Sequence, residues 1–213
     1  MNIIITSATA FEIAKAQQQI KPRKNIHISF AVTGIGMLAT AVNLSKIIYE
    51  ERPDFIIQAG IAGTFDVTVK LGSTYIIEEE FLGDLGVEEQ GKWKDMFDLK
   101  LIKPNAKPFK KKGIINPFIH QYHHLNLTAV KAVTVNQIST QTHHIQQLVK
   151  KYNPCIESME GAALHYLCSL NNIPFLQIRS VSNYVGERDK ALWKIHMAID
   201  NLNKTLVKFI KQV

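Results

Sequence analysis

The fold is decided by residues 155–186, CIESMEGAALHYLCSLNNIPFLQIRSVSNYVG. A short apolar strand at 155–159 leads into a helical pattern at 160–170, and residues 174–182 then form a long apolar run. A run of this kind is typical of a strand that is buried on both faces of a sheet. Strand, helix and buried strand in this order predict a sheet whose neighbouring strands are joined by helices.

The rest of the chain continues the alternation of strand and helix on the N-terminal side and at the C-terminal end. The run NIIITSA at residues 2–8 and the run FIIQA at 55–59 each predict a buried strand. Apolar residues recur with helical spacing over 190–210, which predicts a long amphipathic helix. Further strands are predicted at 26–33, 73–81 and 129–139, and further helices at 38–48 and 141–152. We therefore expect one α/β domain, residues 1–213, with a mainly parallel or mixed sheet.

Composition excludes several classes of protein. The chain has 213 residues, of which 46% are hydrophobic and 20% charged, as in an ordinary globular protein rather than a disordered one. No apolar run approaches the ~18 residues that a membrane span needs, and the first residues lack the pattern of a signal peptide. The two cysteines, Cys155 and Cys168, form no CxxC pair. We therefore expect no disulfide scaffold, no metal site and a cytoplasmic location.

The net charge of +7 raises the question of an acidic partner. Eight lysines fall within residues 92–112, a stretch with no arginine and no RNA-binding aromatic pattern. We expect a solvated surface segment and no nucleic-acid partner. The alternative is that its charge concentrates an anionic small substrate. Residues 83–125 as a whole show little periodicity and predict an irregular excursion, and the glutamates at 78–80 predict an exposed strand end before it.

A glycine motif at residues 34–39, GIGMLA, fits a dinucleotide-binding fingerprint and lies between a predicted strand and a predicted helix. The fingerprint also needs an acidic residue at the end of the next strand, which here ends in Gln58-Ala59-Gly60. We therefore interpret the motif as a tight turn that lets the helix pack close to the sheet, and we expect no organic cofactor.

Five polar or glycine-rich segments follow predicted strands, where ligands bind in α/β sheets. They are residues 7–12, 34–36, 60–63, 158–163 and 179–186. In this order and spacing they resemble the purine nucleoside phosphorylase and nucleosidase superfamily, most clearly in Met159-Glu160 and Ser182-Asn183. The resemblance implies a three-layer α/β/α fold around a central mixed, partly barrel-like sheet. It also implies cleavage of a ribosyl–base bond, and a homodimer in which residues 83–125 reach the partner's site.

The resemblance assigns roles to two carboxylates. Glu160 matches the ribose-binding carboxylate of the family, whose charge also favours a cationic ribosyl group, and Met159 would line the other face of the sugar. Glu12 matches the general base that activates water. The residues alone leave other interpretations open, namely a helix-start glutamate for Glu160 and a solvated glutamate for Glu12. Backbone groups would surround the attacking water at Gly60, Ile61 and Ala62.

Position 183 departs from the adenine-specific nucleosidases of the family, which carry aspartate there. The amide of Asn183 donates and accepts at once, which suits the 6-carbonyl group and the protonated N7 of a 6-oxopurine such as hypoxanthine or guanine. A pocket built on such contacts rejects the wrong partner by about 10⁴ or more. Ser182 beside it is predicted to contact the substrate. The alternative is an asparagine that only forms a turn before Gly186.

Three stretches narrow the resemblance to the futalosine hydrolases of menaquinone biosynthesis: residues 182–189 with Trp193, residues 60–63 with Phe65, and residues 83–88. This resemblance implies hydrolysis of futalosine to hypoxanthine and dehypoxanthine futalosine. Arg188 would then pair with the aryl carboxylate of the substrate, or form an internal ion pair with Glu187 or Asp189.

Two other functions stay open, a 6-oxopurine nucleoside phosphorylase and a non-catalytic nucleoside-binding protein. The sequence favours hydrolysis because residues 60–64 carry no arginine, and Arg179 falls inside a predicted strand. Trp193 is interpreted as a core residue of the last helix, with covering the pocket as the alternative, and Cys168 as a buried, inert thiol. Surface or core positions are also expected for three clustered histidines, His120, His123 and His124.

Overall fold

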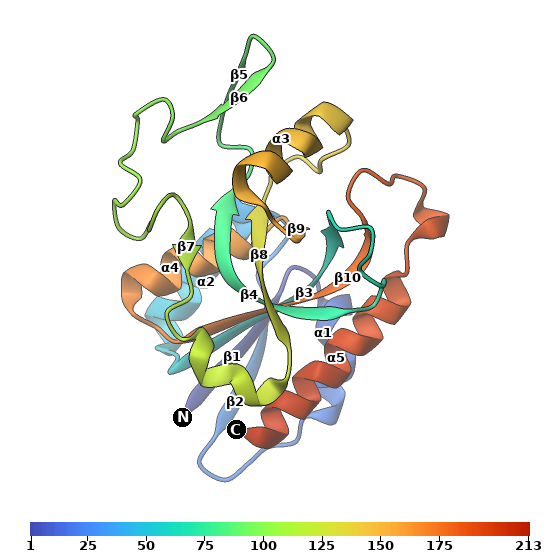
Figure 1. Cartoon of the computed structure of the whole chain (residues 1–213). Helices are drawn as coiled ribbons and strands as arrows, with labels where there is room; N and C mark the ends of the chain where they lie inside the picture. Colours follow the sequence, from blue (N-terminus) through green and yellow to red (C-terminus); the bar gives the residue numbers. More distant parts are fainter.

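The computed structural model describes residues 1–213, and a sheet of eight strands runs through it (Figure 1). The strands are β1 (Asn2–Ser7), β2 (His27–Val32), β3 (Phe55–Thr64), β4 (Thr74–Leu82), β7 (Ile114–Ile115), β8 (Thr128–Thr134), β9 (Ile156–Ser158) and β10 (Phe175–Tyr184). They follow the order β10–β4–β8–β9–β3–β1–β2, with β7 beside β4 and an additional pairing of β10 with β3. This pairing closes β3, β9, β8, β4 and β10 into a small barrel.

The sheet is mixed, as the resemblance predicted. β1 pairs in parallel with β2 and β3, and β3 pairs in parallel with β10. β4 and β8, and β8 and β9, are also parallel, whereas β10–β4, β3–β9 and β4–β7 are antiparallel. The open edge at β2 and the closed ring around β4 therefore belong to one continuous sheet, and the predicted α/β fold with a partly barrel-like sheet is confirmed.

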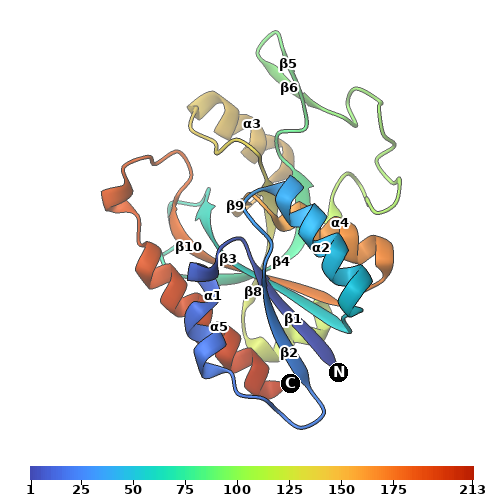
Figure 2. The ribbon, with the colours of Figure 1, turned by 180° about the vertical axis from the view of Figure 1, so that it is seen from behind.

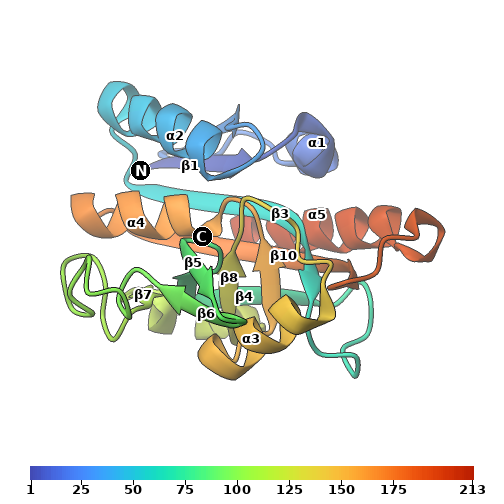
Figure 3. The ribbon, with the colours of Figure 1, turned by 90° about the horizontal axis from the view of Figure 1, so that it is seen from above.

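Helices cover the sheet on two sides, as Figure 2 and Figure 3 show. They are α1 (Ala10–Gln19), α2 (Met37–Glu51), α3 (Thr142–Tyr152), α4 (Gly161–Asn171) and α5 (Ile195–Gln212). Ile57 of β3 packs with α1 and α5, whereas its neighbour Ile56 packs with α2 and α4. Successive side chains of a strand point to opposite faces of the sheet, so this apolar run contributes to the hydrophobic core on each face. None of the helices combines the length and apolar composition that crossing a bilayer requires.

Residues 83–127 leave the barrel and are more ordered than the predicted irregular excursion. They contain the hairpin of β5 (Gly86–Glu89) and β6 (Lys92–Asp95), which extends away from the barrel (Figure 1), then β7 and the 3₁₀ helix η1 (Ile119–Leu125). Lys112 Nζ lies 2.7 Å from Asp98 Oδ1, so the lysine-rich stretch is partly engaged in ion pairs. A small apolar cluster also orders the segment: Met96, Phe97, Phe109 and Ile114.

Two strands continue beyond their predicted ends. β3 runs to Thr64, so Gly60 to Gly63 lie inside the strand and not in a loop. β10 runs to Tyr184, so Asn183 is a strand residue and not a turn residue. The reason is barrel closure, because Gly63 pairs with Asn183 on one side and with Glu157 on the other. These pairings extend the hydrogen-bonded ladder past the apolar runs that the sequence displays.

Two further expectations about the ends of elements are wrong. Glu80 is fully buried rather than at an exposed strand end, and its Oε1 accepts a hydrogen bond from Thr134 Oγ1 at 2.8 Å. The predicted last helix is interrupted, because the 3₁₀ turn η2 (Lys190–Leu192) precedes α5 and leaves Trp193 between them. Leu192, predicted on the apolar stripe, is exposed.

Candidate active site

A cavity of about 260 Å³ opens where the ends of β1, β9 and β10 meet the starts of α1 and α5. We call it the site cavity. Strand segments supply most of its polar groups, while α1, the turn before α2 and the start of α5 supply apolar side chains. It is lined by Ala8, Thr9, Phe11, Glu12, Ile35, Ile61, Ala62, Ile138, Glu157, Ser158, Met159, Glu160, Ser182, Asn183, Trp193, Ile195 and Ile199.

Glu12 is fixed in the first turn of α1 and is 7% exposed, so it is not a solvated surface glutamate. Its Oε2 accepts hydrogen bonds from the backbone N–H of Thr9 at 3.0 Å and from the Thr9 hydroxyl at 3.1 Å. Its Oε1 accepts from the backbone N–H of Ile61 in β3 at 3.1 Å. These donors hold the carboxylate at the wall of the cavity, within reach of a bound substrate, as a general base requires.

Glu160 stands at the N-terminal end of α4 and is 6% exposed. Its Oε1 accepts a hydrogen bond from the backbone N–H of Gly36 at 3.1 Å, and its Oε2 accepts one from Nη1 of Arg179 at 3.2 Å. The glycine turn that resembled a dinucleotide fingerprint therefore holds this carboxylate. Gly36 has φ 89°, a conformation that strongly favours glycine, and it leads directly into α2.

Arg179 is the residue beside the site to which sequence reasoning gave no role there. It lies within β10, is 1% exposed, and donates from Nη2 to Oε1 of Gln58 at 2.9 Å as well as to Glu160. Gly60 on the neighbouring strand makes room for it, because a Cβ at that position would lie 2.2 Å from Nη1. The sequence could have shown this role, because Arg179 stands in the middle of an apolar run. An arginine that is fully buried needs a partner, so a nearby carboxylate could have been predicted.

Asn183 lies at an irregularity in the pairing of β10 with β3, between Val181 and Asn183. Its Oδ1 is 2.7 Å from the Ser182 hydroxyl, which donates to it, and its Nδ2 donates to the carbonyl of Tyr184 at 3.0 Å. A side-chain amide has two N–H groups and two lone pairs. One N–H and one lone pair of the amide therefore have no partner in the protein, and these are the two groups that the sequence assigned to a purine.

The residues predicted for the site are brought together with two exceptions. Glu12, Ile61, Ala62, Met159, Glu160, Ser182 and Asn183 all line the cavity. Gly60 is not among the lining residues and lies behind them, next to Glu12 and Arg179. Arg188 is exposed and outside the cavity, and it forms neither of the ion pairs considered for it.

Trp193 lines the cavity, so its interpretation as a helix core residue is wrong. Its indole N–H donates to the carbonyl of Glu187 at 3.2 Å, and the guanidinium of Arg188 lies 5.5 Å from the centre of its ring. Arg188 thus orders a wall of the cavity through a cation–π contact instead of lining it. Sequence reasoning also missed several lining residues that come from distant segments: Phe11, Ile35, Ile138, Glu157, Ile195 and Ile199.

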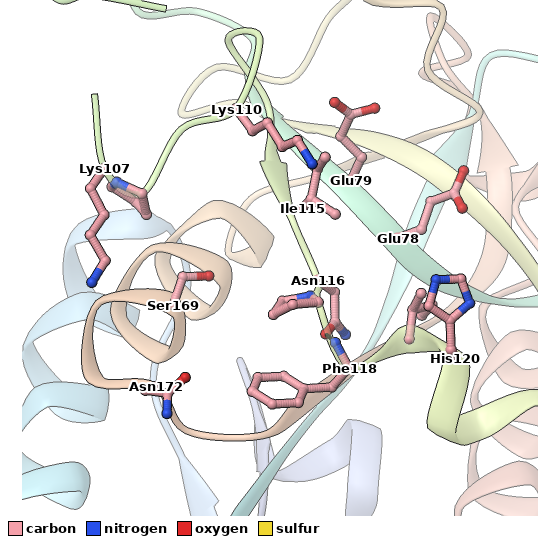
Figure 4. A pocket seen from close by; sticks show the side chains of 13 residues that line it. Glu78, Glu79, Lys107, Lys110, Ile115, Asn116, Phe118, His120, Ser169 and Asn172 are labelled. Atoms are coloured by element: carbon pink, nitrogen blue, oxygen red, sulfur yellow. Dashed lines mark hydrogen bonds between the residues drawn. The ribbon is translucent and has the colours of Figure 1, made fainter. Parts of the chain in front are cut away.

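A larger hollow of about 610 Å³ lies on another part of the surface, between β4, η1 and the end of α4 (Figure 4). Two of its polar side chains, those of Glu79 and Asn116, already have partners in the surrounding structure. Glu79 pairs with Lys131 at 2.9 Å, and the amide of Asn116 is bonded to the backbone of Phe118 and Phe175. The site cavity, by contrast, is lined by three buried carboxylates, those of Glu12, Glu157 and Glu160, and we therefore take it as the candidate active site.

Comparison with known proteins agrees with the fold. The family model described as the Phosphorylase superfamily matches residues 7–212. The chain is 24% identical over 240 residues to the 5'-methylthioadenosine/S-adenosylhomocysteine nucleosidase of Tolumonas auensis, with 100% of each chain covered. It is also 24% identical over 182 residues to the futalosine hydrolase of Thermus thermophilus, covering 84% of this chain and 80% of the relative. The native structure of futalosine hydrolase from Helicobacter pylori superposes with a TM-score of 0.83 at 15% identity, covering 100% of this chain and 98% of that one.

A closed five-strand barrel within a mixed sheet defines an α/β protein of the nucleoside phosphorylase kind. The chain belongs to the Phosphorylase superfamily, whose model matches nearly all of its length. Its relatives divide between futalosine hydrolases and methylthioadenosine/S-adenosylhomocysteine nucleosidases at similar identity, so the choice of substrate has to be argued from the site.

Proposed function

We propose that this protein is a purine nucleosidase that hydrolyses the N-ribosidic bond of futalosine and releases hypoxanthine. The observation that carries the proposal is the pair of buried carboxylates, Glu12 and Glu160, each held by backbone N–H groups at one cavity. Cleavage of a ribosyl–base bond passes through a cationic, oxocarbenium-like transition state. Two fixed negative charges beside the sugar stabilise that cation without reorganising at the moment of reaction.

In the proposed mechanism each carboxylate has a separate task. Glu160 accepts hydrogen bonds from the ribose hydroxyls, and Met159 covers the other face of the sugar. Glu12 takes a proton from the attacking water, which reaches the anomeric carbon from the side opposite the base. Arg179 does not touch the substrate in this mechanism. It orients the Glu160 carboxylate from behind through one hydrogen bond, so we regard it as a positioning residue.

The departing base is assigned to Asn183 with Ser182 beside it. The free N–H of the Asn183 amide would donate to the 6-carbonyl oxygen, and its free lone pair would accept from N7–H once the departing base has taken a proton at N7 from solvent water. A 6-aminopurine presents a donor where the carbonyl stands, so the same amide would face it unpaired. This argument supports a 6-oxopurine nucleoside, and the resemblance of residues 182–189 to futalosine hydrolases supports futalosine in particular.

Water rather than phosphate is the proposed acceptor of the ribosyl group. Arg179 is the arginine beside these carboxylates, and it is 1% exposed, with Nη1 donating to Glu160 and Nη2 to Gln58. A phosphate would therefore meet two carboxylates and no free arginine, which disfavours the phosphorylase alternative.

We also propose that the protein acts as a homodimer built from its single domain, residues 1–213. The support is an exposed apolar stripe on α2, where Leu38, Val42 and Tyr49 are 79%, 61% and 83% exposed. Tyr166 and Leu170 of the adjacent α4 are also exposed. Patches of this kind mark protein contacts. Light scattering of the purified protein checks the proposal, and a monomeric mass at micromolar concentration contradicts it.

Product analysis tests the proposed function directly. The protein is incubated with futalosine, inosine and methylthioadenosine, each with and without phosphate, and the released base is identified. We expect hypoxanthine from futalosine without phosphate. Release only in the presence of phosphate would support the phosphorylase, and purine binding without any release would support the non-catalytic alternative.

A further inference from the structure

Glu157 is a buried carboxylate in the site cavity that neither the proposed mechanism nor the sequence analysis uses. It lies on β9, lines the cavity and is only 6% exposed. Gly63 of β3 pairs with Glu157 on one side and with Asn183 on the other, so the three residues form one row across the barrel wall. The row places a carboxylate on one side of a glycine and the Asn183 amide on the other.

Only one oxygen of Glu157 has a partner. Its Oε1 accepts a hydrogen bond from the backbone N–H of Ser139 at 3.1 Å, and its Oε2 has none. The Ser139 hydroxyl, buried nearby, is also unpaired. Burial raises the pKa of Glu157, although the hydrogen bond from the backbone N–H of Ser139 acts against this rise. An acceptor that is buried without a donor destabilises a protein, so such a group needs a purpose or a ligand.

The width of the row suits a purine. Glu157 and Asn183 are separated by two strand spacings, roughly 9.6 Å between backbones, and Gly63 between them has no side chain. A bicyclic base lying over Gly63 would meet the Asn183 amide with its N7 side and Glu157 with its N1 side. Gly63 also faces the amide directly, because a Cβ there would lie 3.4 Å from Asn183 Nδ2.

We propose that Glu157 selects 6-oxopurines by accepting a hydrogen bond from N1–H of the base. In hypoxanthine and guanine N1 carries a hydrogen and donates, whereas in adenine N1 has a lone pair and accepts. An ionised carboxylate therefore pairs with the first kind of base and repels the second. This inference rests on the proposed function and adds to it, because it specifies which purine edge is recognised and by which residue.

The decisive variant is Glu157→Gln, which replaces the acceptor Oε2 with an amide group that donates. The glutamine carbonyl oxygen retains the bond to Ser139 N–H, while an N–H₂ group replaces the unpaired Oε2. We expect calorimetry to show that the wild type binds hypoxanthine at least about tenfold more tightly than adenine. In the variant this preference should shrink by about tenfold or invert, because the new amide donates to N1 of adenine. Glu78→Gln, in the unrelated hollow, is the matched control and should leave the preference unchanged.

A second measurement needs no variant. 1-Methylhypoxanthine keeps the 6-carbonyl and N7 but lacks the N1 hydrogen, and it should bind to the wild type at least about tenfold more weakly than hypoxanthine. Equal binding of these two bases, or an unchanged preference in a folded Glu157→Gln protein, overturns the inference and points to the Ser139 hydroxyl as the partner of Oε2. Hydrolysis of nucleosides without base preference overturns the inference alone, whereas a protein that neither binds nor cleaves any purine overturns the proposed function with it.

Discussion

The carboxylate of Glu160 and the guanidinium of Arg179 form an ion pair across the inner wall of the barrel, with 3.2 Å between Oε2 and Nη1. Their side chains are 8% and 2% exposed, so both charges depend on each other and on hydrogen bonds from Gly36 and to Gln58. Breaking such a buried pair on one side leaves an uncompensated charge. The pair therefore links the stability of the barrel to the position of the carboxylate proposed to hold ribose.

Replacing Arg179 with methionine tests this link. Loss of one partner of a buried pair costs about 3–5 kcal/mol, so the free energy of unfolding of Arg179→Met should fall by about that amount in urea titrations. The double variant Arg179→Met with Glu160→Gln should recover part of the loss, because no buried charge is then left without a partner. Equal stability of wild type and single variant would show that Glu160 finds another partner.

Replacing Glu160 with glutamine should remove turnover while the fold persists. The amide keeps the shape of the side chain but lacks the negative charge that stabilises a cationic ribosyl group. We expect kcat for futalosine to fall by at least ~10³, with a far-ultraviolet circular dichroism spectrum like that of the wild type. A kcat near the native value contradicts the proposed role of Glu160.

The variant Asn183→Asp tests which base leaves. A protonated aspartate can donate to N7, as the family resemblance implies for adenine-specific nucleosidases, but it no longer combines an N–H donor with a separate acceptor. We expect kcat/KM for the 6-oxopurine substrate to fall by about 10² or more, while that for methylthioadenosine stays equal or rises. Full retention of futalosine hydrolysis would show that Asn183 does not read the base.

Glu80 makes stability depend on pH. Complete burial raises its pKa from 4.5 to about 7, against the opposing effects of the Thr134 hydrogen bond and of Arg179. The folded protein therefore holds a proton on Glu80 between pH 4.5 and 7, where the unfolded chain has lost it. Its contribution to stability falls as the pH rises through this window, by roughly 3 kcal/mol in total.

The variant Glu80→Gln isolates that contribution. It should be more stable than the wild type at pH 8 and nearly equal to it at pH 4.5, when unfolding is followed in urea. Burial lowers the pKa of His165 from 6.5 to about 4, so both proteins lose stability as the pH falls through that range and the difference between them is unaffected. A difference that does not change with pH would show that Glu80 keeps one protonation state.

The sequence predicted the layers of the fold because burial leaves a local signature. The runs at 2–8, 55–59 and 174–182 coincide with β1, β3 and β10. Each run is continuously apolar because both faces of its strand are covered. The ends of these strands were less predictable. Gly60 to Gly63 and Asn183 lie beyond the apolar runs in sequence, and pairing across the closed barrel makes them strand residues.

Part of the candidate site was also visible in the sequence. Glu12, Met159, Glu160 and Asn183 follow buried strands within a few residues or end them, and the structure brings all four to one cavity. Arg188 and Trp193 were misplaced because nothing local shows that the last helix begins only at Ile195. Their contact with each other depends on the path that the chain takes between β10 and α5.

The sequence by itself determined the type of fold and the identity of the acidic residues, because periodicity and strand ends are properties of short segments. Only the tertiary structure decided their partners. Gly36 and Arg179 are 124 and 19 residues away from Glu160, and Gly63 pairs with Asn183 on one side and Glu157 on the other. Closure of the barrel brings these residues together, and the pattern of residues within one segment cannot predict which distant segment will pair with it.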